Sequence, residues 1–208
     1  MNRSTIILFA LLTFPAAALA QHGGGASPPP VAPREASQFD FLTGEWALVV
    51  RPKVSGLAAR IHGAPRLEGT WRAWRAFDGW GIEDELRIVD AGGTTRALTH
   101  TMRIYDPTTQ HWTSTSLDVT RARFQAASAE WQGGRMQSTS RGTDQEGRPV
   151  LTRTRFTDIT PTSFRFQQDR SVDDGTTWED AILTIEARRT ASAAAAAGPA
   201  GVPAGSRP

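Results

Sequence analysis

The chain is divided into about ten short runs in which apolar and polar residues alternate, separated by turn formers such as Asp78-Gly79 and Gly133-Gly134. No segment between two runs is long or apolar enough to be the helix that joins parallel strands. Hairpin-length connections favour an antiparallel up-and-down barrel over a Greek-key sandwich, which needs some long connections. The predicted strands are residues 46–50, 67–77, 81–89, 96–105, 111–119, 122–131, 135–142, 150–157, 163–171 and 178–188.

The first twenty residues have the three parts of a secretory signal peptide. Arg3 supplies a positive start, residues 6–14 an apolar core, and Ala18-Leu19-Ala20 a small-residue cleavage site. The apolar core is shorter than the roughly 20 residues that a membrane-spanning helix needs. The sequence therefore predicts removal of residues 1–20 and export to the periplasm or out of the cell, with no membrane span.

The remaining chain divides into a barrel domain and two low-complexity flanks. Residues 21–36 are rich in Gly and Pro and are predicted to be a disordered linker, and residues 190–208 a disordered Ala/Gly/Pro tail. Residues 37–189 then form one barrel domain. Within it, residues 52–66 place four apolar residues at helical spacing, which predicts a short lid helix over one barrel mouth, with an irregular loop as the alternative.

Composition excludes several classes of function. The net charge is only +2, and basic residues are scattered among acidic ones, whereas a nucleic-acid binder gathers them on one face. Without cysteine the chain has no disulfide, thiolate nucleophile or sulfur metal ligand. His62, His100 and His111 lack a metal-binding spacing, so no metal site is predicted. Strands of a membrane barrel also alternate, but lipid contact would be costly for the polar residues in the apolar phases.

The start of the first strand carries a short motif, Gly44-Glu45-Trp46, preceded by the apolar anchors Phe39, Phe41 and Leu42. It resembles the G-x-W motif of lipocalins and other calycin barrels, and the chain is similar to bacterial lipocalin-like domains. In calycins this tryptophan packs across the closed barrel end against an arginine from near the end of the last strand. The resemblance implies structural roles for Gly44 and Trp46, with Arg188 or Arg189 stacked on the indole.

A second motif precedes the last strand. Residues 171–178, Ser-Val-Asp-Asp-Gly-Thr-Thr-Trp, resemble the Asp-box of sialidases and other propellers. A single copy without internal repeats argues against a propeller. The resemblance therefore implies only a hairpin, in which Asp173 accepts bonds from turn amides, Gly175 takes a positive φ and Trp178 packs beneath the turn.

Polar residues that share a strand phase with apolar ones are the candidate ligand contacts, because burial without a partner is costly. They are Arg75, Asp84, His100 and Gln168. Arg75 and Asp84, on neighbouring strands, are expected to pair as a buried bridge. His100 has three interpretations: a hydrogen-bonded core residue, an acid–base catalyst beside Asp84, or the axial ligand of a haem.

These features predict an exported barrel that binds a small, largely apolar molecule non-covalently. The tryptophans, Trp71 among them, are expected to form flat cavity walls, with the four polar candidates making contacts. No catalytic residue and no cofactor is assigned. The alternatives are a hydrolase or isomerase using the same cavity, a haem-binding barrel, and a structural module whose barrel is filled.

Overall fold

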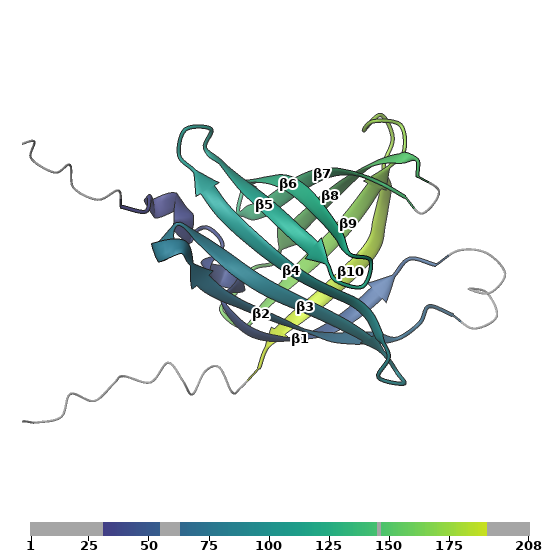
Figure 1. Cartoon of the computed structure of the whole chain (residues 1–208). Coiled ribbons are helices and arrows are strands. Elements are labelled where there is room, and N and C mark those ends of the chain that lie inside the picture. Colours follow the sequence, from purple (N-terminus) through teal and green to yellow (C-terminus); the bar gives the residue numbers. More distant parts are fainter. Residues whose placement is uncertain (1–30, 55–62, 145–146, 191–208) are drawn as a thin grey trace, which may run out of the picture. The chain divides into compact units, whose positions relative to one another are not determined.

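Ten strands close into one barrel in the computed structural model, which describes residues 31–54, 63–144 and 147–190 (Figure 1). Each strand pairs antiparallel with its neighbours in sequence, and β1 pairs with β10 to complete the barrel. This confirms the predicted all-β, up-and-down fold. The strands are β1 Gly44–Pro52, β2 Leu67–Ala76, β3 Gly81–Asp90, β4 Thr95–Asp106, β5 His111–Asp118, β6 Arg123–Gln132, β7 Arg135–Thr143, β8 Pro149–Thr157, β9 Ser163–Ser171 and β10 Glu179–Arg189.

The described helices are short 3-10 turns: η1 Arg34–Ser37, η2 Asp40–Leu42 and η3 Phe77–Gly79. The disordered linker predicted for residues 21–36 is wrong at its C-terminal end. There η1 begins at Arg34, and Ala36 is buried in the core with an exposed fraction of 4%. A single buried alanine leaves little apolar signal in a segment rich in Gly and Pro. The predicted signal peptide, most of the lid segment and residues 191–208 of the predicted tail lie outside the described residues.

The N-terminal turns close one end of the barrel, which we call the floor (Figure 1). Phe39 and Leu42 are buried there, and the Phe39 ring meets the Trp112 ring edge-on at 4.8 Å between centroids. Trp112 Nε1 donates to Gln38 Oε1 at 3.0 Å, and Trp46 Nε1 donates to the Leu42 carbonyl at 2.7 Å. The buried indole N–H groups thus find partners in the segment that plugs the floor.

Arg189 completes the floor by stacking on Trp46, with its guanidinium carbon 4.2 Å from the ring centroid. It also donates to the carbonyls of Thr43 at 2.8 Å and Pro161 at 2.7 Å. The cation expected from the calycin resemblance is therefore present, but it is Arg189. Assigning this role to Arg188 was wrong, because Arg188 follows the inward-facing Ala187 and is exposed on the outer face.

The turn between β9 and β10 has the hairpin geometry implied by the Asp-box resemblance. Asp173 accepts hydrogen bonds from the Thr177 amide at 2.8 Å and the Thr177 hydroxyl at 2.6 Å. Ser171 Oγ donates to Asp173 at 2.7 Å and accepts from the Gly175 amide, whose φ is +89°. Trp178 Nε1 donates to the Gly175 carbonyl at 3.0 Å, so the indole is fixed to the turn.

Replacing Gly44 tests the floor. Its φ is +114°, and an added Cβ would lie 2.3 Å from Arg189 Nη1, so Gly44→Ala combines backbone strain with displacement of the stacked guanidinium. We expect a loss of about 2–4 kcal/mol in the free energy of unfolding, measured with urea. Gly93→Ala is the matched control, because Gly93 also has a positive φ but nothing within 4 Å, and it should cost about 1–2 kcal/mol. Equal losses in the two variants would contradict this role of Gly44.

The Asp173 turn should contribute to stability in a pH-dependent way. Hydrogen bonds from the Thr177 side chain, the Thr177 amide and Ser171 lower the pKa of Asp173 to about 2. An unfolded aspartate titrates near pH ~3.9, so the contribution is present above about pH 4 and is lost as the pH falls towards 2. The urea midpoints of the wild type and of Asp173→Asn should therefore converge as the pH falls from 5 to 2, because the unfolded and folded pKa values of Asp173 both lie in this range. A constant gap between the two curves would show that this carboxylate does not titrate as described.

Candidate ligand-binding site

Above the floor the barrel encloses a cavity of about 490 Å³. Ligand sites for small organic molecules commonly have volumes of roughly 300–1,000 Å³, so the space suits such a molecule. At its far end, which we call the mouth, the lining includes Arg96, Asp118 and Arg121, which lie where strands β4 to β6 begin or end. The filled-barrel alternative is therefore wrong: the interior is hollow.

One wall of the cavity is apolar. It comes from strands that are neighbours in the barrel, β9, β10, β2 and β3, with β1 between β10 and β2. Aromatic rings near the floor form part of this wall. The centroid of the Trp71 ring lies 5.7 Å from the ring centroids of Phe156 and Phe166. Its residues are Trp71, Leu86, Ile88, Phe166, Ile182 and Leu183, joined near the floor by Phe39, Trp112 and Phe156.

The opposite wall carries hydroxyl groups, which come from β4, β5, β7 and β8. Thr101 and Ser116 share a hydrogen bond of 2.9 Å, and Ser138 and Thr154 share one of 2.7 Å. Two hydroxyls hold two protons, and their mutual bond uses one, so each pair keeps one donor for a ligand. The hydroxyl residues of this wall are Thr99, Thr101, Ser114, Ser116, Ser138, Ser140, Thr152 and Thr154.

A buried ion pair lies between the two walls, just above the floor. Asp84 is 1% exposed; one carboxylate oxygen accepts from Trp71 Nε1 at 2.7 Å and the other faces Arg103 Nη1. Burial lowers the pKa of the Arg103 guanidinium to about 9, which still leaves it protonated at neutral pH. The Arg103 guanidinium carbon also lies 5.2 Å from the Phe39 ring centroid. Near the floor the cavity therefore contains a neutralised charge pair, which is bonded to an aromatic wall residue.

The sequence candidates separate in the structure. Trp71, Asp84 and Gln168 all line the cavity, as their strand phases predicted. Arg75 lies at the end of β2, 46% exposed at its side chain, and pairs with Asp40 of η2. The predicted Arg75–Asp84 bridge is therefore wrong: the cation beside Asp84 is Arg103, supplied by β4 on the other side of β3.

His100 lies on the outer face of the barrel. Its neighbours along β4, Thr99 and Thr101, line the cavity, and successive side chains in a strand alternate sides. The His100 ring lies 3.6 Å from Glu83 and 3.7 Å from Glu85, measured between nitrogen and carboxylate oxygen. His100 therefore cannot act on a molecule in the cavity or ligate a haem held there. Of the described residues that line the cavity, none is His, Cys, Lys or Tyr.

Sequence reasoning missed Arg103 and the hydroxyl wall because it assumed that the apolar phase of β4 faces inward. The reverse holds: Met102 and Ile104 are 39% and 42% exposed, while Thr101 and Tyr105 are buried. A signal was available, since the turn at residues 107–110 sets Tyr105 opposite Trp112. Two large aromatic residues facing each other beside a turn indicate the inward phase, which includes Arg103.

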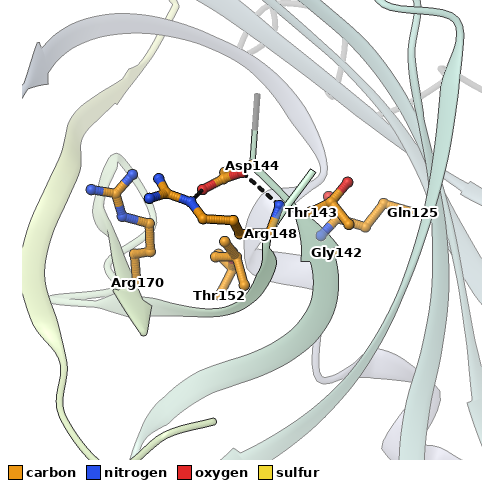
Figure 2. Close-up of a pocket in the computed structure, with 8 residues that line it drawn as sticks. Gln125, Gly142, Thr143, Asp144, Arg148, Thr152 and Arg170 are labelled. Atoms are coloured by element: carbon orange, nitrogen blue, oxygen red, sulfur yellow. Dashed lines mark hydrogen bonds and ion pairs between the residues drawn. The ribbon is translucent and has the colours of Figure 1, made fainter. Parts of the chain in front are cut away.

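A second hollow, which we call the mouth pocket, adjoins the cavity over β6 to β9 and has a volume of about 560 Å³ (Figure 2). Gln125 and Thr152 line both spaces, so the two hollows adjoin at these side chains. Arg148 and Arg170 also line the mouth pocket. Arg148 donates from Nε to Asp144 at 2.7 Å, and Arg170 donates from Nη2 to Glu179 at 2.7 Å.

Within the part of the chain that the structure describes, no group of three or more His, Cys, Asp or Glu side chains is placed to hold a metal ion. No described helix is long and apolar enough to cross a membrane. The described cavity therefore offers hydroxyls, the two amides of Gln125 and Gln168, and paired charges, set against aromatic and aliphatic surface. This arrangement can bind and orient a molecule through hydrogen bonds and apolar contact.

Neither a protein-family model nor a curated protein sequence matches the chain. Among solved structures, the structure of EF1p2_mFAP2b bound to DFHBI matches with a TM-score of 0.38 and 10% sequence identity. The match covers 74% of this chain and 98% of that chain.

The Asp84–Arg103 pair gives the test of this site. Asp84→Asn removes the carboxylate and leaves a buried cation, so we expect a loss of about 3–5 kcal/mol in the free energy of unfolding. Adding Arg103→Met removes that cation and should recover part of the loss. The exposed pair Asp40–Arg75 is the matched control, and Asp40→Asn should cost less than about 1 kcal/mol. A double variant no more stable than Asp84→Asn alone would refute the description of Asp84 and Arg103 as a coupled pair.

Proposed function

We propose that the protein is an exported binding protein that holds one small, largely apolar molecule in the barrel cavity without chemical change. The observation that carries this proposal is the division of the cavity into an apolar wall and a hydroxyl wall. A flat molecule between them would lay one face on aromatic rings and present polar groups on its other side. The signal-peptide pattern in residues 1–20 supports export to the periplasm or out of the cell.

The apolar wall accounts for affinity. Burying apolar surface contributes about 25 cal/mol per Å², so about 200 Å² of ligand surface placed against Trp71, Phe156 and Phe166 would contribute about 5 kcal/mol. Part of this is offset by the lost freedom of the ligand. Aromatic side chains lose little conformational entropy on binding, because those rings already pack against one another at 5.2 to 5.7 Å.

The hydroxyl wall accounts for selectivity. Each hydroxyl pair already satisfies itself and keeps one donor, so a ligand with carbonyl or hydroxyl groups gains bonds there. A charged group at the same depth would lose its hydration without an opposite unpaired charge, since Asp84 and Arg103 neutralise each other. The cavity therefore favours ligands whose buried part is uncharged. This chemistry also supports binding over catalysis.

Fluorescence of N-phenyl-1-naphthylamine, a neutral aromatic probe, measures the proposed binding. We expect saturable enhancement at one site per chain, together with quenching of the cavity tryptophans. Ala127→Phe places a phenyl group in the cavity and should weaken binding more than ten-fold, since it removes space that the probe occupies. Ala126→Phe, the next residue of β6, points outward and serves as the matched control, with affinity unchanged.

Circular dichroism would first establish that both variants keep the β-sheet spectrum of the wild type. Absence of saturable binding by the wild type would overturn the proposal. Equal weakening by both variants would also overturn it, because binding would then not occur in the cavity.

A further inference from the structure

We propose that the mouth pocket binds an oxyanion at one end of the ligand, so that the ligand is an amphipathic anion whose apolar body lies in the barrel. This inference rests on the proposed function and adds the ligand class to it. The mouth pocket is lined by Arg148, Arg170, Gln125, Thr143 and Thr152, whose side chains donate hydrogen bonds, and by the carboxylate of Asp144, which accepts from Arg148. A carboxylate, sulfate or sulfonate accepts bonds from such donors.

The two hollows adjoin, because Gln125 and Thr152 line both. Gly142 leaves room there for the Gln125 side chain, since an added Cβ would lie 3.3 Å from the Gln125 amide nitrogen. The Gln125 amide is held by its bond to Ser140 at 2.8 Å. In the proposal, the ligand extends from the cavity past these two side chains into the mouth pocket.

The inward side chains of β9 become steadily more polar from the floor to the mouth. Phe164 is buried in the floor, Phe166 and Gln168 line the cavity, and Arg170 lines the mouth pocket. Residues in a strand rise about 3.3 Å each, so Phe166 and Arg170 are about 13 Å apart along it. That distance matches an aromatic body of two or three rings with a charged group at one end.

Figure 2 shows Arg148 and Arg170 among the side chains that line the mouth pocket, with the bond between Arg148 and Asp144 dashed. Arg170 donates to Glu179 through one Nη2 proton, and a guanidinium has five donors. Glu179 is also 3.4 Å from Lys53 Nζ, so it keeps a cation if Arg170 turns to a ligand. Arg170 therefore offers fork-shaped donors that suit an oxyanion, next to the Arg148–Asp144 pair in the lining.

Two probes that share the same aromatic rings and differ in charge distinguish binding in the mouth pocket from binding in the cavity. 8-Anilinonaphthalene-1-sulfonate has the rings of N-phenyl-1-naphthylamine plus a sulfonate. We expect the sulfonate probe to bind about ten-fold more tightly than the neutral probe at 20 mM salt, with a smaller ratio at 150 mM, since exposed charges are screened. Ala127→Phe should weaken both probes, because both place their rings in the cavity.

Arg170→Gln should lower affinity for the sulfonate probe about ten-fold and leave that for the neutral probe unchanged. Arg148→Gln provides a second variant with the same expected pattern, in case one of the two folds poorly. Arg141→Gln is the matched control: it removes the same charge from the neighbouring outer surface, where Arg141 pairs with Asp174, and should change neither affinity.

Equal affinity for the two probes, with saturable binding retained, would overturn the anion site and leave the proposed function intact. A loss of sulfonate affinity in Arg141→Gln as large as in Arg170→Gln would also overturn it, because the preference would then come from the general surface charge. If neither probe binds, the proposed function and this inference both fail.

Discussion

The contact between Arg189 and Trp46 joins the last residue of the final strand to the first strand, and the rest of the barrel depends on that closure. The chain has no cysteine, so no disulfide can hold β1 against β10. A cation stacked on an indole contributes roughly 0.5–2 kcal/mol, and Arg189 adds two hydrogen bonds to carbonyls on either side. Gly44 leaves room for this guanidinium, which explains a glycine at that position of the motif.

A closed and well-packed floor allows the other half of the barrel to be hollow. An empty apolar void of 490 Å³ would cost about 12 kcal/mol at about 24 cal/mol per Å³, as much as the whole stability of a typical domain. The hydroxyl wall avoids that cost, because water can occupy a polar cavity and bond to it. The hydroxyls thus support a stable hollow barrel, in addition to the recognition role that we propose for them.

Much of the fold could be predicted from the sequence, because alternation and turn residues are local signals. The phases of β2, β3 and β9 placed Trp71, Asp84 and Gln168 correctly, since those strands combine large apolar residues with a packed interior. The phase of β4 could not be assigned by hydropathy. Its inward row forms part of the hydroxyl wall of the cavity, so polar side chains point inward and Met102 and Ile104 point outward.

The candidate site was harder to predict than the fold for the same reason. His100 was interpreted as an inward residue because it shares a phase with Met102 and Ile104, and that phase faces out. The partner of Asp84 was missed because β3 has two neighbours, and Arg103 lies on the one whose phase was inverted. Hydropathy predicts which apolar side chains fill a core. It does not predict the polar side chains that line a ligand cavity, because a filled core contains few of them.

The hydroxyl pairs also explain how such a cavity can select a ligand while losing little energy when empty. Thr101 with Ser116, and Ser138 with Thr154, satisfy one another across neighbouring strands, so displacing water from them leaves few broken bonds. Affinity then follows mainly from the area placed against the apolar wall, and the remaining donors fix the orientation of the ligand. A molecule that met only the hydroxyls would gain little over water. The apolar wall and the hydroxyl wall therefore have to be used together, which restricts the ligand to an amphipathic shape.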